Sequence, residues 1–352
     1  MGRRPEASRQ GAVLANEDFR SLGKPISDHH IGKRVDSYLA LHYPFLTRAG
    51  WQKRLSLGQV KVLGEAIHSA YKLKEGDVLT HYNPEENEPE INPYIFPFWE
   101  ENGVMAVYKP SNLPMHEGGK YRKHTFCELL RKDIGEEWAA VHRLDRDTSG
   151  LVLCSNDSVL RNQLSMELRE RTLEKTYLAI ARGVPREDSW VESRPLGIVP
   201  HHTWREKRWV VEEGLPSQTE FKVIDTAGEF CLLKVKPKTG RTHQIRIHAA
   251  VNDLPLVGDT RYNPDENIFL EFLDHGFTEN VIQKIDAPRL CLHATALSFI
   301  HPVSEKRCDV AIPMPDDMSF IWRRLKAQAS LPIESIDVVH SISFKDRFEF
   351  VK

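Results

Sequence analysis

The 352-residue sequence lacks the features that would place it in a membrane or outside the cell. No apolar run approaches the ~20 residues that a membrane-spanning helix requires. Residues 1–6 include two arginines and a glutamate, and they lack the apolar stretch of a secretory signal. We therefore expect a cytoplasmic protein that makes no contact with a membrane.

Metal-binding and redox patterns are also missing. The five cysteines include no pair at the CxxC spacing of zinc and redox sites, so we expect reduced thiols packed as small hydrophobic groups. The adjacent histidine pairs at 29–30 and 201–202 have a spacing that rarely brings both rings to one ion. We expect no metal and no other cofactor.

The net charge of −2 gives no overall excess of positive charge, but the charges are unevenly distributed. Residues 31–66 carry six basic and two acidic side chains, and residues 234–248 carry five basic and no acidic ones. Acidic residues collect in 84–102 and 265–288. Separate basic stretches suit a protein that binds a polyanion on one face, although solvated surfaces would give the same pattern.

The length predicts two domains with tails. We predict a flexible arm over residues 1–30 and a small compact unit over 31–82, with helices near 35–42 and 47–56 between short strands. Residues 83–102 contain four prolines among acidic and aromatic residues, which predicts a linker.

The larger unit is expected over residues 103–325. A C-terminal extension, 326–352, follows it, and its sequence indicates no function. Strands outnumber helices and seldom alternate with them, which predicts an α+β fold with a mainly antiparallel mixed sheet. Strands are expected at 104–108, 151–154, 175–182, 219–224, 230–236 and 292–300, and helices at 125–132, 160–168 and 241–251.

Residues 142–150, His-Arg-Leu-Asp-Arg-Asp-Thr-Ser-Gly, are the densest group of functional side chains in the sequence. They directly precede a buried strand, so a loop here would hold the Asp145 carboxylate at the rim of a sheet. Taken alone, such an aspartate is more often the cap of a turn or a helix.

Two other segments offer partners for this carboxylate. Alternation along 175–182 puts Tyr177 on the face opposite the apolar set at 176, 178 and 180, so its ring can face a cleft. A helix over 241–251 would align Arg241, Ile245 and His248 on one side. An arginine there could keep a carboxylate ionised in a desolvated pocket.

The nine-residue segment 142–150 resembles the signature of the RluA-type pseudouridine synthases. Three further segments match that family in order: 107–116, the lysine–tyrosine strand at 175–179, and 239–262. The resemblance covers roughly residues 31–315.

The resemblance implies an enzyme that converts uridine in RNA to pseudouridine without a cofactor. It makes Asp145 the catalytic carboxylate, Tyr177 the residue that stacks on uracil and assists proton transfer, and Arg241 the partner of Asp145. It also implies that Ile245 forms an apolar wall for the base and that Arg143 holds the substrate open. We expect His142 to orient the loop by hydrogen bonding.

Residues 32–39, 47–49, 58–62 and 73–78 resemble the small RNA-binding domain first known in ribosomal small-subunit protein four. The expected partner is therefore ribosomal or transfer RNA, bound by a monomer. The expected RNA-binding residues are Lys33, Arg34, Arg48, Lys53, Arg54, Lys61, Lys236 and Lys238.

Two alternatives can be tested. A catalytically silent RNA-binding or ribosome-assembly factor would keep the basic surfaces without needing a buried carboxylate. An aspartyl-phosphate phosphatase would use an Asp-x-Asp pair such as 145–147, but His142 and Arg143 interrupt the apolar strand that should lead into it.

Overall fold

The computed structural model describes residues 19–327 apart from 24, 27, 44–45, 83–87, 119–120 and 200–206. The chain divides into two compact units at Asn87 and Glu88, and each is described by itself. The predicted arm up to residue 18, the histidine pair at 201–202 and the extension from residue 328 lie outside the described residues.

The described part of the N-terminal unit consists of two α-helices, a short 3-10 helix (Asp28–His30) and a small sheet. Helices α1 (Val35–His42) and α2 (Arg48–Ser56) lie near the predicted positions. The Thr47 side chain caps α2 by accepting a hydrogen bond from the Gly50 N–H at 3.1 Å. Four short antiparallel strands are arranged in the order β1-β4-β2-β3, namely β1 (Arg20–Ser21), β2 (Val60–Val62), β3 (Glu65–Ala66) and β4 (Leu79–His81).

The boundary predicted between arm and unit at residue 30 is wrong. Strand β1 pairs with β4, and Ile26 is buried in the core of the N-terminal unit. This pairing was hard to foresee because only isolated apolar residues, Leu22 and Ile26, join that core.

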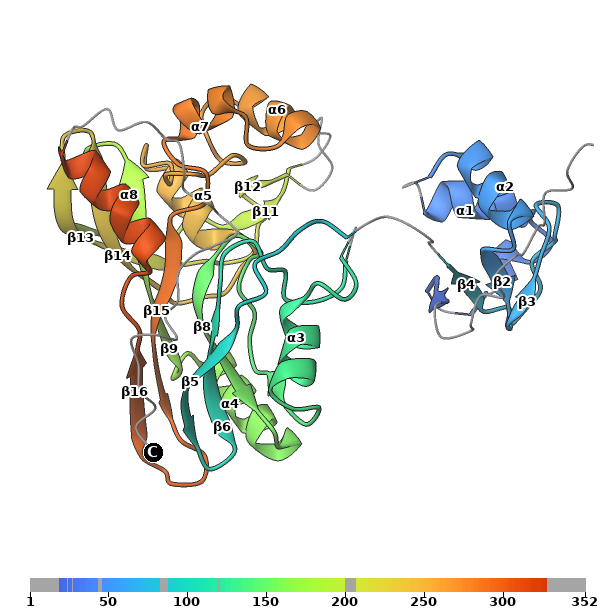
Figure 1. Ribbon diagram of the computed structural model, residues 1–352, viewed down its shortest axis with the longest axis horizontal. Coiled ribbons are helices and arrows are strands. Elements are labelled where there is room, and N and C mark those ends of the chain that lie inside the picture. The colour runs from blue at the N-terminus through green and yellow to red at the C-terminus, as the bar shows by residue number, and fades with distance from the viewer. Residues whose placement is uncertain are drawn as a thin grey trace, which may run out of the picture. The chain divides into compact units, whose positions relative to one another are not determined.

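The C-terminal unit is built on a mixed sheet, as predicted (Figure 1). Its strand order is β10-β13-β14-β9-β15-β8-β6-β5, with β16 beside β15 and β7 beside β8. The β15–β8 pair is parallel and the other described pairs are antiparallel. The α+β prediction is therefore confirmed.

The strands of this sheet are β5 (Phe96–Glu101), β6 (Val104–Lys109), β7 (Ala139–Ala140), β8 (Ser149–Ser155), β9 (Glu174–Arg182), β10 (Ser189–Glu192), β13 (Thr219–Ala227), β14 (Phe230–Pro237), β15 (Leu292–Ile300) and β16 (Arg307–Ala311). Strands β11 (Leu196–Ile198) and β12 (Arg208–Val210) form a separate ribbon. The helices are α3 (Phe126–Asp133), α4 (Ser158–Glu170), α5 (Gln244–Ala250), α6 (Asn267–His275), α7 (Glu279–Ile285) and α8 (Asp316–Ala327).

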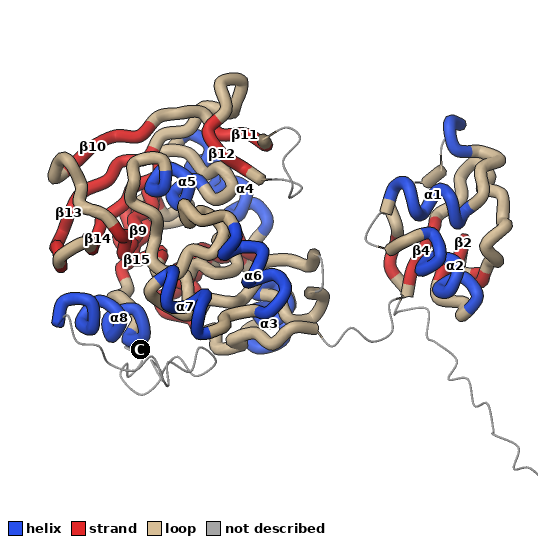
Figure 2. Tube along the Cα trace, turned by 90° about the horizontal axis from the view of Figure 1, so that it is seen from above, coloured by secondary structure: helices blue, strands red, loops and turns tan. Residues whose placement is uncertain are grey.

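Helices cover both faces of the sheet. Phe126 of α3 and Ala249 of α5 belong to the core on one face, whereas Leu164 of α4 and Ile321 of α8 pack on strands from the other. Helices α6 and α7, within the acidic stretch, lie side by side around a small core of their own (Figures 1 and 2).

The predicted linker ends too late. Residues 96–101 form β5, which pairs with β6 and ends the sheet. The register of this pair shifts between Pro97 and Trp99. Proline is tolerated at an edge strand and at a bulge because no ladder donor is needed there. The prolines therefore indicated an edge strand as well as a linker.

Gly150 has a backbone conformation that the sheet requires. Its φ is +125°, and an added Cβ would lie 2.3 Å from the Ala294 carbonyl oxygen on β15. We expect Gly150→Ala to lower the free energy of unfolding by about 3 kcal/mol, at the upper end of overpacking effects. Urea unfolding followed by tryptophan fluorescence would measure this. Gly118→Ala, where an added Cβ meets nothing within 4 Å, is the matched control.

Candidate active site

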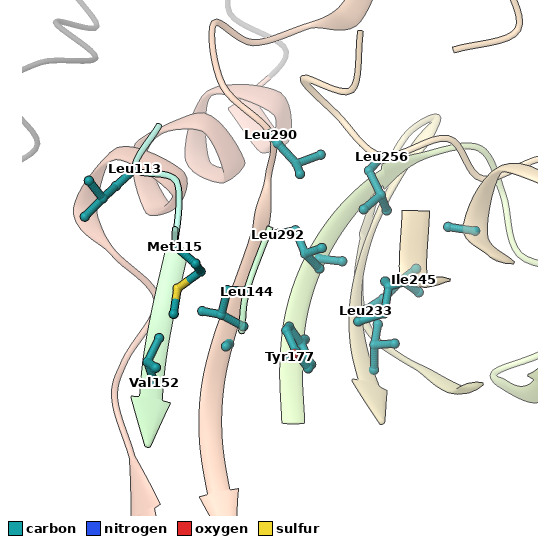
Figure 3. Close-up of a cluster of buried hydrophobic side chains, with 14 of the residues drawn as sticks. Leu113, Met115, Leu144, Val152, Tyr177, Leu233, Ile245, Leu256, Leu290 and Leu292 are labelled. Carbon is teal, nitrogen blue, oxygen red and sulfur yellow. The ribbon is translucent and has the colours of Figure 1, made fainter. Parts of the chain in front are cut away.

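A cavity of about 280 Å³ lies where three segments of the C-terminal unit meet. They are the loop before β8, strand β9 and the turn between β14 and α5, and residues from the end of α4 and the start of β15 complete the lining. Its volume is close to the lower end of small-molecule sites, about 300–1,000 Å³. Figure 3 shows Tyr177 with Leu144 on one side and Ile245 on the other, all three of which line the cavity.

The loop that carries Asp145 is anchored by a buried lysine at the end of β6. The Lys109 Nζ donates hydrogen bonds to the carbonyls of Pro110, Leu113 and Arg146 at 2.8, 2.7 and 3.0 Å. Three acceptors match the three N–H bonds of an ammonium group. The Ser111 hydroxyl adds a hydrogen bond to the Asp147 carbonyl at 2.7 Å, so the turn after β6 fixes both residues that follow Asp145.

Asp145 lines the cavity, and no hydrogen bond or ion pair joins its carboxylate to another side chain in the described part of the chain. Burial raises the pKa of the Asp145 carboxyl. The positive charge of Arg246 is the strongest influence that lowers this pKa, followed by that of Arg143. Asp145 is thus a desolvated acid held near cations, with its oxygens free for a substrate.

Arg246 is the buried guanidinium of the site. It lies on α5, is 5% exposed and lines the cavity. Its Nε and Nη2 donate to the two Asp259 oxygens at 2.7 and 2.8 Å, a two-bond geometry that fixes the plane of the guanidinium. The centre of the Tyr262 ring lies 5.0 Å from it, and the Tyr262 hydroxyl is 2.7 Å from the His243 Nδ1.

Arg241 does not have the position predicted for it. Helix α5 begins only at Gln244, after His243 in the left-handed conformation with φ 59°. The Gln244 side-chain oxygen accepts from the Arg241 N–H at 3.0 Å, which keeps residue 241 in the turn. The Arg241 side chain is exposed, and its Nε donates to the Pro216 carbonyl at 3.2 Å. The counter-charge assigned to Arg241 therefore belongs to Arg246.

The sequence contained a signal for Arg246 that our interpretation missed. Arg246 stands between Ile245 and Ile247 in a segment that is otherwise expected to be buried. An arginine in such a segment is rarely buried without a partner. Arg241 was chosen as the partner of Asp145 because the helix was predicted to begin at residue 241, three residues before α5 begins.

Tyr177 lies in the core as well as at the cavity, and it is 6% exposed. The prediction that only residues 176, 178 and 180 face the core is wrong, because Tyr177, Ala179 and Ala181 pack in the largest hydrophobic cluster. Both faces of β9 are covered. Burial raises the pKa of the Tyr177 hydroxyl, so the ring is neutral at physiological pH.

His142, Arg143 and Ile245 also line the cavity. The His142 Nε2 accepts a hydrogen bond from the Leu153 N–H at 3.1 Å, which ties the loop to β8. Burial lowers the pKa of His142 to about 3, so the ring is neutral. The geometry favours an orienting role for this residue. Arg143 is exposed at the rim, and Ile245 is buried beside Tyr177.

The predicted RNA-binding residues fall into two groups. Lys236 and Lys238 line the cavity, but each forms an ion pair, with Glu174 at 3.4 Å and with Glu220 at 3.1 Å. In the N-terminal unit, Arg34 and Arg48 both form ion pairs with the buried Asp36, at 3.0 and 3.1 Å. Asp36 thus fixes these two arginines.

The other four predicted residues lie on the N-terminal unit. Lys33 and Lys53 are exposed. Arg54 donates to the Gln59 side chain at 3.0 Å, and the Lys61 ammonium lies 4.0 Å from the centre of the Phe19 ring. Lys33 and Lys53 therefore differ from Arg34 and Arg48, which are also exposed, in having no carboxylate partner among the described residues.

Within the described ranges, no three His, Cys, Asp or Glu side chains come together as ligands for a metal ion. The helices described there are also too short or too polar to cross a bilayer. A carboxylate, an aromatic ring and a rim of cations line one cavity, a combination that suits a reaction on a base of a nucleic acid.

Comparisons with known proteins identify the family to which the chain belongs. The model of the family "RNA pseudouridylate synthase" matches residues 103–251. Over 320 residues the chain is 30% identical to "Ribosomal large subunit pseudouridine synthase D" of Vibrio cholerae, covering 88% of this chain and 96% of that protein. It is also 30% identical to "Ribosomal large subunit pseudouridine synthase C" of Pasteurella multocida, covering 87% and 94% of the two chains.

A solved structure, "Human RNA Pseudouridylate Synthase Domain Containing 4", shares the fold with a TM-score of 0.52 at 22% identity, over 65% of this chain and 92% of that one. The chain belongs to the RNA pseudouridylate synthase family. It is an RNA pseudouridine synthase, an isomerase, as the sequence motifs predicted, and not a phosphatase.

The two arginines allow a direct test of the corrected site. Arg246→Gln removes the strongest positive influence on Asp145, so its pKa should rise further. If the ionised carboxylate is the active form, activity is lost as pH falls through this pKa. The acid limb of the kcat/KM profile should therefore move to higher pH, and kcat should fall about 100-fold, as for the removal of other electrostatic partners.

Arg241→Gln is the matched control, because it removes the same charge from the exposed turn. It should leave the acid limb in place and change mainly KM. The double variant Arg246→Gln, Asp259→Asn separates catalysis from folding, since it leaves no unpaired buried carboxylate at residue 259. An acid limb that moves with Arg241→Gln and not with Arg246→Gln would contradict the assignment.

Proposed function

We propose that this protein converts uridine to pseudouridine in large-subunit ribosomal RNA, with Asp145 as the reactive carboxylate. The observation that carries the proposal is the position of Asp145. It lies in a cavity beside Tyr177, its oxygens make no side-chain hydrogen bond or ion pair among the described residues, and Arg246 provides the buried positive charge. Ribosomal RNA is proposed because the relatives from Vibrio cholerae and Pasteurella multocida carry that substrate in their names.

The chemistry needs only side chains. The bond between the ribose C1′ and the uracil N1 breaks, the base turns, and C1′ joins C5. The proton leaves C5 and N1 gains one, so the product is an isomer of the substrate. The Asp145 carboxylate has three possible first acts: attack on the ribose, removal of a ribose proton, or addition to the base. Each of them requires the ionised form, which Arg246 favours.

The uridine must leave its stack before it enters the cavity, at a cost of a few kcal/mol. Stacking on the Tyr177 ring offsets part of this cost, since base–aromatic stacking contributes about 1–3 kcal/mol. Ile245 and Leu144 supply apolar walls beside the ring. Burial raises the pKa of the Tyr177 hydroxyl, which therefore keeps its proton at neutral pH, and we assign the ring to stacking on the base.

The N-terminal unit is proposed to be the small RNA-binding domain that its sequence resembles. The resemblance is supported by its two helices and four-stranded sheet, and by the exposed Lys33 and Lys53. Contacts of such lysines with phosphates give affinity that depends on salt and only weakly on sequence.

The catalytic assignment is tested with Asp145→Asn. We expect the variant to bind ribosomal RNA with near wild-type affinity and to form no detectable pseudouridine. The measurement is chemical mapping of pseudouridine in large-subunit ribosomal RNA from cells that lack the gene and are complemented with either form. Sites that return with wild type and also with the variant would remove Asp145 from the mechanism. Pseudouridines that depend on the gene but are found in transfer RNA and not in ribosomal RNA would contradict the proposed substrate and leave the role of Asp145 unaffected.

The N-terminal unit is tested by its contribution to the salt dependence of binding. The double variant Lys33→Gln, Lys53→Gln should flatten the plot of log affinity against log salt by up to about two units, because each lysine bound to a phosphate contributes about one unit. Lys132→Gln with Lys222→Gln removes the same charge from exposed positions of the C-terminal unit and should leave the slope unchanged. Equal slopes for both double variants would show that the proposed surface does not bind phosphates.

A further inference from the structure

Lys175 is a cation of the cavity that neither the loop anchoring nor the chemistry of Asp145 uses. It lies on β9 two residues before Tyr177, so both side chains are on the same face of the strand. Its ammonium lies close to the turn between β14 and α5, since an added Cβ on Gly240 would be 3.8 Å from the Lys175 Nζ.

The other cations that line this cavity are paired or exposed. Lys236 and Lys238 have carboxylate partners, and Arg246 is held by Asp259. Arg143, Arg171 and Arg241 are exposed to solvent. Lys175 is partly buried, and among the described residues its ammonium has no hydrogen-bond acceptor and no ion-pair partner.

A partly buried ammonium without an acceptor is unfavourable, and a lowered pKa is the expected sign of this. Burial lowers the pKa of Lys175 to about 8. A group left in this state gains most from a ligand that brings a negative charge into the cavity. Replacing it by an apolar residue should not destabilise the fold, so its presence is better explained by a ligand than by packing.

The charge of Lys175 acts on a different part of the site from that of Arg246. Arg246 and Arg143 are the strongest positive influences on Asp145, whereas Lys175 is the charge that most lowers the pKa of His142. Lys175 therefore lies on the His142 side of the cavity. Residues two apart on a strand are separated by about 7 Å, which is comparable to the distance from a nucleotide's base to its own phosphate.

We propose that Lys175 binds a backbone phosphate of the RNA next to the uridine that stacks on Tyr177. The inference rests on the proposed function, because it assumes that the cavity receives a flipped uridine. It adds a second point of attachment on the same strand. The base is held at residue 177 and the phosphate at residue 175, so one rigid strand fixes the nucleotide at both ends relative to Asp145.

The test uses the full chain with Lys175→Met, Lys175→Arg and the control Lys222→Met, an exposed lysine of β13 that does not line this cavity. Binding to a transcript of large-subunit ribosomal RNA is measured against salt concentration. Lys175→Met should flatten the slope of log affinity against log salt by about one unit. Lys175→Arg should keep the wild-type slope, and Lys222→Met should also leave it unchanged.

The pH dependence of binding gives a readout that a purely structural lysine would not move. Wild-type affinity should fall several-fold as pH rises above about 8, because the free ammonium then loses its proton. Lys175→Arg should lose this dependence, since arginine stays protonated. All variants share the other titratable and charged groups that line this cavity, which are His142, Arg143, Asp145, Arg171, Glu174, Tyr177, Lys236, Lys238, Arg241, His243 and Arg246.

Three results would overturn the inference. The slope could stay unchanged in Lys175→Met while kcat falls, which would indicate a contact with a uracil carbonyl. Lys175→Met could unfold at a lower urea concentration than wild type with an unchanged slope, which would indicate a structural role. Lys222→Met could flatten the slope equally, which would indicate an effect of general surface charge. Pseudouridine mapping reports on the proposed function separately, because these binding slopes do not depend on turnover.

Discussion

The buried ion pair of Arg246 and Asp259 is the interaction on which the site depends. Taking a carboxylate out of water raises its pKa, and Asp145 is subject to this effect. Arg246 opposes it, but a buried arginine itself needs a partner, which Asp259 provides through two hydrogen bonds. One guanidinium therefore serves two carboxylates. Asp259 takes its hydrogen bonds, while Asp145 receives its charge and keeps its own oxygens unoccupied.

The loop of Asp145 and the turn before α5 are held in place by different kinds of side chain, a lysine in the first case and a glutamine in the second. The loop is fixed from behind by a cation, Lys109, which binds three carbonyls. The turn is fixed by a neutral amide, because Gln244 bonds to the Arg241 N–H on one side and to Thr219 on the other. Both arrangements use side chains to satisfy backbone groups or hydroxyls. Among the described residues, the Asp145 carboxylate and the Lys175 ammonium line the cavity without a side-chain partner.

The sequence allowed six strands of the large sheet, helices α1 to α5 and the Asp145 loop to be predicted, because apolar periodicity and an unusual motif are local signals. Helices α6, α7 and α8 were not predicted. The prediction failed for strands that form only by pairing with segments distant in the sequence or that contain a proline. Strand β1 was missed because its pairing with β4 crosses some sixty residues of chain, and β5 was missed because proline masks an edge strand. Arg241 and Arg246 are both arginines of one motif, and only the start of α5 at Gln244 decides which of them is buried.

The parallel pairing of β15 with β8 has a consequence for how the enzyme is made. Asp145 precedes β8 and Tyr177 lies on β9, and these two strands are joined in the sheet only through β15 between them. Residues 292–300 leave the ribosome more than a hundred residues after Tyr177. Until then the two halves of the site have no common strand, and closing such a long loop is slow. We therefore expect the active site to form late in synthesis, after the whole N-terminal unit has been made.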